Sequence, residues 1–506
     1  MSARQDSDDV AWERSDEAWD EDMRQARQDS VGRKIEAFAG NMFGSPATVV
    51  DPIILGGFNA VYPLRIENRP DIVLVRCPLP NRPLFPEEKT LSEAATVTFL
   101  SQRTQIPMPK LFNYGVDAEI GPFLVMQDLG SRRDLCDVLA APREDPDETP
   151  VLRADIPEGK LKNVYREVGS FLLQMAQFTF PRIGSLLETS PGCFDVLTRP
   201  MTVNMTAIVH QSNIPKSIYP AKDTTYPTAD AWYTTLADIQ LATLLFQHND
   251  IVESEDDCRT KYVARQLFRR LAKQGRLASF GFSDDNWSAQ AQSMTATLPA
   301  PSGSGSNAFR LWADDFRPAN IMVADDDDGS GSSSNDTILG AVDWEFAYAA
   351  PAQFVLNPPW WLLLQVPELW EDGLDDWARV YDGRVRTWLA ALEEAERDMP
   401  EGALLLAAYM RQSWETGRFW LDYAARKSFA FDAVYWKFLD ERFFGEREEA
   451  LDGHELWKAR VDLLSAEERA TMERMVQIKM EEAEERVLVE WGDDEARERL
   501  ASFLFD

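Results

Sequence analysis

The chain has 506 residues, with 85 Asp and Glu against 52 Lys and Arg, so its formal net charge is −33. So acidic a protein repels phosphate backbones and anionic lipids, which argues against a nucleic-acid partner and against electrostatic docking on a membrane. Hydrophobic residues make up 44% of the sequence, enough for a large core, which excludes global disorder. The 4 cysteines form no CxxC pair and the 3 histidines no HExxH motif. This composition disfavours a disulfide framework, a thiolate zinc site and a histidine-based triad.

The first forty residues form an acidic extension that we expect to be partly helical or disordered. They contain no apolar run of the length that a signal peptide needs. No stretch of the chain approaches the roughly 18 uninterrupted apolar residues of a membrane-spanning helix. We therefore expect a cytoplasmic protein.

The segment 41–130 combines short β-type runs with one amphipathic helix, at 87–103. Glycine, asparagine and proline separate the runs, as they do at tight turns. This order predicts an α+β unit with a mainly antiparallel sheet. The β-type runs lie at 48–55, 60–66, 71–77 and 121–130.

The segment 131–506 is predicted to be mainly helical. Apolar residues recur at helical spacing along much of it, and the part after 368 is rich in tryptophan and acidic residues. A Gly/Ser linker is expected at 301–307. The predicted helices lie at 160–180, at 229–275 (two or three helices) and, as one long helix, at 465–486.

One segment, 309–346, carries most of the chemistry that the sequence offers. Two apolar runs, 321–323 and 338–342, flank a polar loop, which predicts a β-hairpin. In an antiparallel hairpin the start of the first strand and the end of the second meet, so Asn320 and Asp343 are expected to lie together. A carboxylate and an amide oxygen suit Mg²⁺. Asp315, five residues upstream of Asn320, could accept a hydroxyl proton, which completes the parts needed for phosphoryl transfer.

The same segment resembles the aminoglycoside phosphotransferase-like family of the protein kinase-like superfamily, and its fungal phosphotransferase-family branch in particular. The catalytic and metal motifs correspond to 315–320 and 342–345. Each motif is weak alone, but their order and spacing are typical of the family over roughly 40–450. Further matches are the nucleotide-covering loop (56–62), the strand with the phosphate-contacting cation (73–76), the helix with its acidic partner (92–95), the hinge strand (123–126) and a fungal-type segment (413–420).

The resemblance implies a two-lobed, kinase-like α+β fold, with an N-lobe at 41–130, a helical C-lobe at 131–506 and ATP with Mg²⁺ between them. It implies an ATP-dependent phosphotransferase that acts on a hydroxyl of a small molecule, with Asp315 as the base. Asn320 and Asp343 would bind Mg²⁺. Arg76 would contact the phosphates, and Glu93 would hold Arg76. The nucleotide-binding set is Gly56, Gly57, Asn59, Val61, Arg76, Glu93 and Met126.

Two departures from the family keep an alternative open. Arg76 stands where many members have lysine, although arginine can still clamp phosphate oxygens. Ala313 stands where the family usually has a histidine that supports the catalytic aspartate. The alternative is a catalytically weak pseudokinase that acts as a nucleotide-binding or scaffold protein, and a protein kinase is a fainter third reading.

Simpler explanations also exist for individual motifs. Asp315 and Asn320 could only cap a turn, and the Gly56-Gly57 pair could be an ordinary hairpin turn. Arg76 and Glu93 could form a surface salt bridge of little value. The run Asp325–Asp328 lacks the EF-hand spacing and is read as a solvated loop rather than a calcium site.

Most tryptophans of the C-terminal third are expected in the core. Two pairs, Trp414 with Glu415 and Trp420 with Asp422, could instead form a site for a cationic acceptor. The sequence does not identify the acceptor or the oligomeric state.

Overall fold

The computed structural model describes residues 7–143, 145, 148–294, 296–301, 308–325, 337–447 and 451–505. Most of the expected Gly/Ser linker (302–307) and three of the four residues of the aspartate run (326–328) lie outside the described residues. Among the helices of these ranges, none is both long and apolar enough to cross a membrane.

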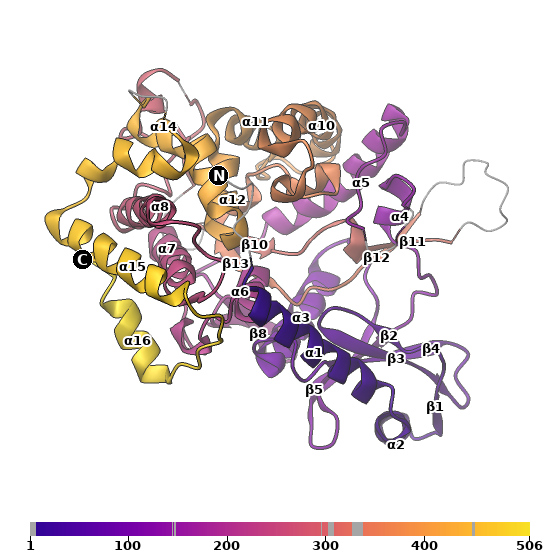
Figure 1. The fold of residues 1–506 in the computed structure, drawn as a ribbon. Helices are drawn as coiled ribbons and strands as arrows, with labels where there is room; N and C mark the ends of the chain where they lie inside the picture. The colour runs from indigo at the N-terminus through magenta and orange to yellow at the C-terminus, as the bar shows by residue number, and fades with distance from the viewer. Residues whose placement is uncertain are drawn as a thin grey trace.

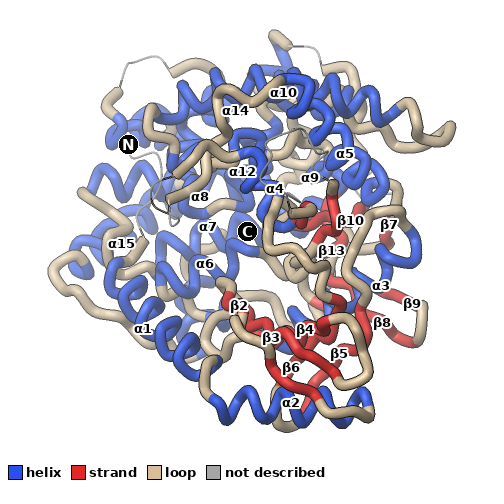
Figure 2. The backbone as a smooth tube through the Cα atoms, turned by 90° about the vertical axis from the view of Figure 1, so that its right-hand side faces the viewer, coloured by secondary structure: helices blue, strands red, loops and turns tan. Residues whose placement is uncertain are grey.

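The N-terminal lobe is built on a six-stranded antiparallel sheet (Figures 1 and 2). Its order is β1-β3-β4-β6-β5, and β2 pairs with β3. The strands are β1 (Ala47–Val49), β2 (Ile54–Leu55), β3 (Asn59–Ile66), β4 (Ile72–Pro78), β5 (Leu111–Asp117) and β6 (Gly121–Gln127). The expected helix between β4 and β5 is α3 (Pro86–Arg103).

Side chains of the sheet alternate between two environments, as successive residues of a strand must. One set packs beneath α2 (Asp29–Phe43) in a separate hydrophobic cluster, which includes Tyr62, Leu64, Val73 and Val75. The neighbouring residues face the other way and line a cavity between the lobes; they include Val61, Leu74, Arg76, Leu124 and Met126. The period-2 pattern of β3, β4 and β6 thus places an apolar core on one face and a binding surface on the other.

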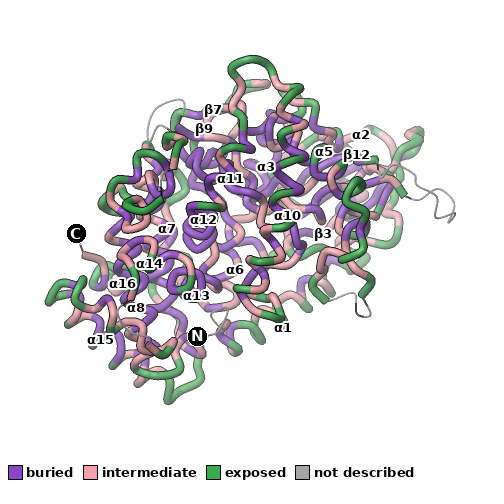
Figure 3. The backbone as a smooth tube through the Cα atoms, turned by 90° about the horizontal axis from the view of Figure 1, so that it is seen from above, coloured by how far each residue is buried: buried purple, intermediate pink, exposed green. Residues whose placement is uncertain are grey.

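The rest of the chain is mainly helical, and buried segments fill its centre while exposed ones lie at its edge (Figure 3). The two-lobed α+β architecture expected from the sequence is confirmed. The helices are α4 (Leu135–Leu139), α5 (Glu158–Ala176), α6 (Val203–Ser212), α7 (Ala229–Phe246), α8 (Glu255–Lys273), α9 (Ala352–Val355), α10 (Gly373–Glu396), α11 (Ala407–Thr416), α12 (Arg418–Arg426), α13 (Phe431–Val434), α14 (Asp440–Phe444), α15 (Ala466–Glu482) and α16 (Asp493–Ala501).

Several strands were not predicted. In the N-terminal lobe β5 was missed because Asn113 and Gly115 interrupt its apolar pattern. In the helical lobe a three-stranded sheet has the order β13-β10-β7, and β8 and β9 form a hairpin. Only the hairpin of β11 and β12 was expected there. These strands are β7 (Thr179–Phe180), β8 (Ser185–Ser190), β9 (Cys193–Thr198), β10 (Phe309–Ala313), β11 (Ile321–Val323), β12 (Ile338–Ala341) and β13 (Ala347–Pro351).

The acidic N-terminal extension forms α1 (Asp9–Ala26) and α2, and α1 contacts both lobes (Figure 1). On the helical lobe, the buried carboxylate of Asp8 accepts hydrogen bonds from the side-chain amide of Asn249 at 2.9 and 3.0 Å. On the sheet lobe, the buried carboxylate of Asp22 accepts from the backbone and side chain of Asn81 at 2.9 and 2.7 Å. The two ends of α1 therefore tie the lobes together.

A histidine lies in a second contact between the lobes and gives folding a pH dependence. His210 of α6 donates from Nε2 to the backbone carbonyl of Arg82, 2.6 Å away. Burial lowers the pKa of His210 to about 4, and the nearby cations Arg82, Lys216 and Arg14 add to this effect. The unfolded chain takes up the proton near pH 6.5. Stability that is fully present above pH 6.5 is therefore lost as the pH falls toward 4.

We expect His210 to account for about 1–2 kcal/mol of the stability lost between pH 7 and pH 5. Urea unfolding of the wild type and of His210→Asn at the two pH values measures this contribution. The variant should lose less stability on acidification than the wild type, while His454→Gln serves as the control histidine substitution. An unchanged pH slope in His210→Asn would remove this residue from the account.

Candidate active site

A cavity of about 320 Å³ lies between the inner face of the N-terminal sheet and the β11–β12 hairpin. The hairpin contributes Met322, Val342 and Asp343 to its lining. All seven residues expected to bind a nucleotide line this one cavity: Gly56, Gly57, Asn59, Val61, Arg76, Glu93 and Met126. Asp315 and Asn320 do not line it but lie in the segment that leads into the hairpin.

The glycine pair forms the tight turn between β2 and β3. The backbone N–H of Gly56 donates to the carbonyl of Asn59 at 2.9 Å, and Leu55 pairs with Ala60. The pair is thus a hairpin turn, as the simpler explanation holds, and it also lines the cavity. On its outer side, Nε of Arg82 donates to the carbonyl of Gly57 at 3.2 Å.

Arg76 on β4 is 8% exposed and is surrounded by three carboxylates. Nη1 bonds Glu93 of α3, and Nη2 bonds Asp343 and, at 2.9 Å, Oε2 of Glu345. Burial lowers the pKa of Arg76, but Asp343, Glu93 and Glu345 together raise it well above its ordinary value. Since the Arg76 and Glu93 side chains are 9% and 3% exposed, the surface salt bridge considered above is wrong. The guanidinium is fixed at the cavity wall.

The pKa of Glu93 is also shifted in this cluster. Burial raises the pKa of its carboxyl to about 7, and Arg76 opposes that rise. The neighbouring carboxylates Glu345 and Asp343 raise it further. The acid partner of Arg76 therefore sits in a site where negative charge is already crowded.

Two residues of this cluster were missed by the sequence reasoning: Lys89 and the role of Glu345. The ammonium of Lys89 bonds Oε2 of Glu345 and, at 3.0 Å, Oδ1 of Asn59, whose amide also donates to Glu345 at 2.9 Å. Both charged side chains are 1% exposed. Glu345 of the helical lobe thus ties β3, β4 and α3 to the hairpin. The sequence did contain one indication that Lys89 lies near this cluster: it stands four residues before Glu93, on the same face of a helix.

The hairpin brings Asn320 and Asp343 together, as expected from the sequence. Ile321 pairs with Ala341, and the N–H of Val342 donates to the carbonyl of Asn320 at 2.9 Å, so Asn320 lies next to Asp343. Asp343 has φ +64°, the left-handed region that non-glycine residues avoid. Such backbone strain concentrates at functional sites because the surrounding structure has to maintain it.

Asp315 lies beside Asn320, whose amide Nδ2 donates to the Asp315 carbonyl at 2.7 Å and to its carboxylate at 3.2 Å. Nε of Arg317 lies 3.0 Å from the other carboxylate oxygen. Burial raises the pKa of Asp315, and Asp343 adds to that rise, while Arg317 and Lys427 oppose it. The hydrogen bond from Asn320 to the backbone carbonyl of Asp315 is the local contact that a turn-capping residue makes. The carboxylate nevertheless keeps 22% of its surface exposed and is accessible to a ligand.

The alanine at position 313 leaves Asp315 supported by other groups. Ala313 pairs with Ala347 in the β10–β13 ladder. Its neighbour Asp314 is held by Nη1 of Arg426 at 2.9 Å. Asn320 and Arg317 hold the Asp315 carboxylate itself, so its orientation does not depend on a histidine at 313.

The donor set of the hairpin fits a magnesium ion. Within the described ranges there is no group of three or more His, Cys, Asp and Glu side chains that could hold a metal. Asp343 and Asn320 offer one carboxylate and one amide oxygen, since Nδ2 of Asn320 is directed at Asp315. Mg²⁺ is commonly held by one or two such oxygens together with substrate phosphates and water.

One of the two tryptophan–acid pairs, Trp420 with Asp422, does not form an accessible cation site, which corrects that part of the expectation. Asp422 is fully buried and bonds the Tyr233 hydroxyl at 2.5 Å and the Asn357 amide at 2.8 Å. Trp420 is 3% exposed and stacks on Phe438 with ring centroids 3.9 Å apart. The carboxylate of Asp422 and the ring of Trp420 are therefore both buried in internal contacts and not accessible to a ligand. In the other pair Trp414 is half-buried and donates to Asp382 at 3.0 Å, and Glu415 is exposed.

Comparison with known proteins finds similarity in fold rather than in sequence. No protein-family model matches the chain, and no curated protein matches its sequence. Among solved structures, the aminoglycoside phosphotransferase APH(4)-Ia is similar over 88% of this chain and 98% of its own, with 13% identity and a TM-score of 0.35.

Two further structures are comparably similar. The wild-type aminoglycoside 2'-phosphotransferase-IIIa, a GDP complex, matches 86% of this chain and 99% of its own at 11% identity, with a TM-score of 0.36. A putative fructosamine-3-kinase from Haemophilus somnus 129PT matches 85% and 97% at 10% identity, with a TM-score of 0.34.

Proposed function

We propose that the protein is an ATP-dependent phosphotransferase that moves the γ-phosphate to a hydroxyl of a small molecule. One observation carries this proposal: the nucleotide-binding set and Asp343 line a single cavity, and the hairpin holds Asn320 beside Asp343. The seven residues come from the β2–β3 turn, β3, β4, α3 and β6.

In this proposal the sheet face and the hairpin bind different parts of the nucleotide. The adenine ring would pack against apolar side chains of the sheet, namely Val61, Leu74, Leu124 and Met126. Arg76, at the end of the same face, contacts the phosphates. Asn320 and Asp343 would hold Mg²⁺, which when bound neutralises phosphate charge and orients the γ-phosphate.

Asp315 is the proposed base. Its carboxylate accepts the proton of the acceptor hydroxyl as the new bond forms between that oxygen and the γ-phosphorus. The bond between the γ-phosphorus and the bridging oxygen breaks, and ADP leaves with the electron pair. Asn320 donates to one oxygen of the carboxylate, and the guanidinium of Arg317 forms an ion pair with the other, so both hold it in place.

The charge of the cluster explains why a metal ion would be needed. Two buried cations, Arg76 and Lys89, face three carboxylates, Glu93, Asp343 and Glu345. The cluster therefore has no net positive charge, whether or not Glu93 holds a proton. In a protein of charge −33, such a site attracts a nucleoside triphosphate poorly unless a cation is bound to its phosphates. We therefore expect the protein to bind ATP as its magnesium complex.

Thermal unfolding tests this expectation. Mg²⁺ with ATP should stabilise the wild type, by about 2.7 kcal/mol at a hundredfold excess over the dissociation constant. ATP with EDTA should give little or no shift. Asp343→Asn should lose most of the magnesium-dependent shift, while Asp155→Asn, whose side chain is 76% exposed, should keep it. The absence of any shift with millimolar Mg²⁺ and ATP would contradict the proposed function.

A further inference from the structure

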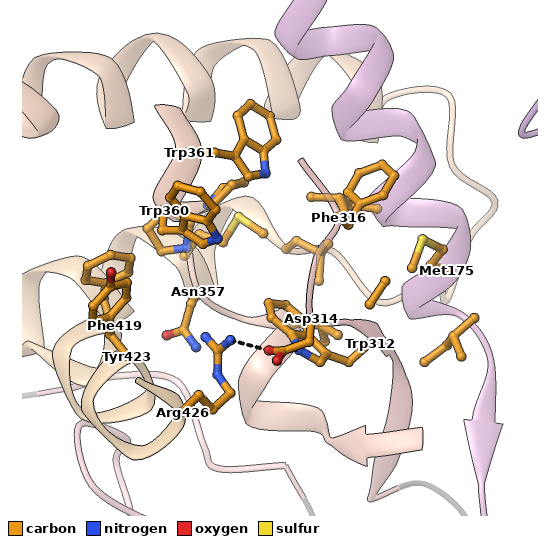
Figure 4. Close-up of a pocket in the computed structure, with 18 residues that line it drawn as sticks. Met175, Trp312, Asp314, Phe316, Asn357, Trp360, Trp361, Phe419, Tyr423 and Arg426 are labelled. Atoms are coloured by element: carbon orange, nitrogen blue, oxygen red, sulfur yellow. Dashed lines mark hydrogen bonds and ion pairs between the residues drawn. The ribbon is translucent and has the colours of Figure 1, made fainter. Parts of the chain in front are cut away.

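A second, smaller pocket lies in the helical lobe, beside the segment that carries Asp315 (Figure 4). Both neighbours of Asp315 in sequence, Asp314 and Phe316, line it. Phe316 also stacks on Trp344, with ring centroids 5.6 Å apart, and Trp344 lines the larger cavity. Phe316 and Trp344 thus connect the two pockets beside the segment that carries the candidate base.

The small pocket is lined by aromatic rings from three distant parts of the chain. Its volume of about 40 Å³ is enough for a small apolar group. Methionine and leucine side chains from α5 and α11 complete the wall. The six aromatic residues are Trp312, Phe316, Trp360, Trp361, Phe419 and Tyr423.

The charges of this pocket cancel. Among the described residues that line it, the one carboxylate is Asp314 and the one cation is Arg426, and they bond each other at 2.9 Å. The remaining acceptor capacity of Asp314 is used by Trp312 Nε1 at 3.2 Å and by the backbone N–H of Val203 at 3.2 Å. No carboxylate of the lining is therefore left to hold an ammonium group.

The aromatic walls are also a poor site for a cation. The guanidinium of Arg426 already lies 4.7 Å from the centroid of Trp312, over its ring. A ligand cation would have to approach a buried arginine and compete for ring faces. The next residue, Lys427, adds positive charge close enough to lower the pKa of Asp315. The two cations Arg426 and Lys427 thus disfavour an ammonium group at this pocket.

We propose that this pocket is the acceptor subsite, and that the acceptor is an uncharged alcohol with a compact apolar end. The apolar end lies among the aromatic rings, and the hydroxyl lies beside the segment that carries Asp315. This inference rests on the proposed function for the role of the bound alcohol, but binding itself does not require ATP. It differs from the cationic acceptor considered from the sequence.

A matched pair of probes tests the charge preference. Choline and 3,3-dimethylbutan-1-ol have the same shape and one hydroxyl, and they differ by the positive charge. Ligand-observed NMR titration of the full chain, without nucleotide, should show the uncharged alcohol binding at least tenfold more tightly than choline. Equal or tighter binding of choline would overturn the proposal, as would the failure of both probes to bind at millimolar concentration.

A filling substitution tests the location. Leu172→Trp places extra volume in the pocket and should weaken binding of 3,3-dimethylbutan-1-ol at least tenfold. Leu405→Trp, at a position that is 45% exposed, should leave it unchanged. If Leu172→Trp does not fold, Val355→Ile adds one methylene to the same wall and should weaken binding in the same direction. Undiminished binding in the folded variant would overturn the assignment.

Both wild type and Leu172→Trp should keep the thermal shift with Mg²⁺ and ATP. This readout separates the two proposals, because the pocket can fail as an alcohol site while nucleotide binding persists. Conversely, alcohol binding without a nucleotide shift would contradict the proposed function and leave the pocket as a binding site.

Discussion

Asp315→Asn is expected to reduce ATP-dependent phosphorylation by about 100- to 10,000-fold, the range that a positioned general base contributes. The substitution keeps the shape of the side chain and its hydrogen bond from Asn320, but it removes the ability to take a proton. Asp315 does not line the nucleotide cavity, so the thermal shift with Mg²⁺ and ATP should persist.

Turnover in this variant is measured as ADP released in the presence of the alcohol acceptor. Asp155→Asn is the control, since it removes one carboxylate from an exposed surface position. Raised pH should increase the activity of the wild type through the pKa of Asp315, which burial and Asp343 hold above its ordinary value. Turnover in Asp315→Asn that equals the wild type would exclude a role for this carboxylate as the base.

Glu345→Ala is expected to lower the free energy of unfolding by about 3–5 kcal/mol, because it leaves buried cations without their partner. Lys89 and Glu345 are each 1% exposed, and Arg76 bonds Glu345 at 2.9 Å. The removed carboxylate also accepts from Asn59, so the link between the hairpin and three elements of the N-terminal lobe is lost. Urea unfolding measures the change.

A double-mutant cycle separates this interaction from the loss of packing. Lys89→Met removes the ammonium but keeps most of the side-chain volume. Combined with Glu345→Ala, it should cost about 1–3 kcal/mol less than the sum of the two single changes, since residues in one buried network are not additive. Additive changes would show that the ion pair does not stabilise the arrangement of the lobes.

The local part of the site was predictable from the sequence because short-range geometry determines it. A hairpin with apolar strands at 321–323 and 338–341 brings Asn320 to Asp343 whatever the rest of the chain does. The glycine turn likewise follows from the adjacent strands β2 and β3. The cation at Arg76 and its partner Glu93 came from the resemblance to a family, not from periodicity.

The parts that were missed depend on tertiary contacts. Lys89 and Glu345 are 256 positions apart, and nothing in either local sequence indicates that they meet. Asp422 was read as available to a ligand, yet it bonds Asn357, 65 positions away, in the core of the helical lobe. Burial and pairing of charged residues therefore decided which carboxylates remain free for chemistry.

The small pocket also escaped the sequence reasoning. Its walls come from α5, β10, the segment after α9 and the pair α11 and α12, which only the folded helical lobe brings together. The hypothesis of a cationic acceptor rested on tryptophans next to acids in sequence. In the fold, the carboxylate that lines the pocket is Asp314, and it forms an ion pair with Arg426.

The transfer of label from [γ-³²P]ATP tests the central claim most directly. The wild type is incubated with Mg²⁺, labelled ATP and 3,3-dimethylbutan-1-ol, and the products are separated. We predict a labelled phosphate monoester of the alcohol, formed by the wild type and not by Asp315→Asn. Binding of Mg²⁺ and ATP without any labelled ester, from this alcohol or from a small-molecule extract, would contradict the account and favour a pseudokinase.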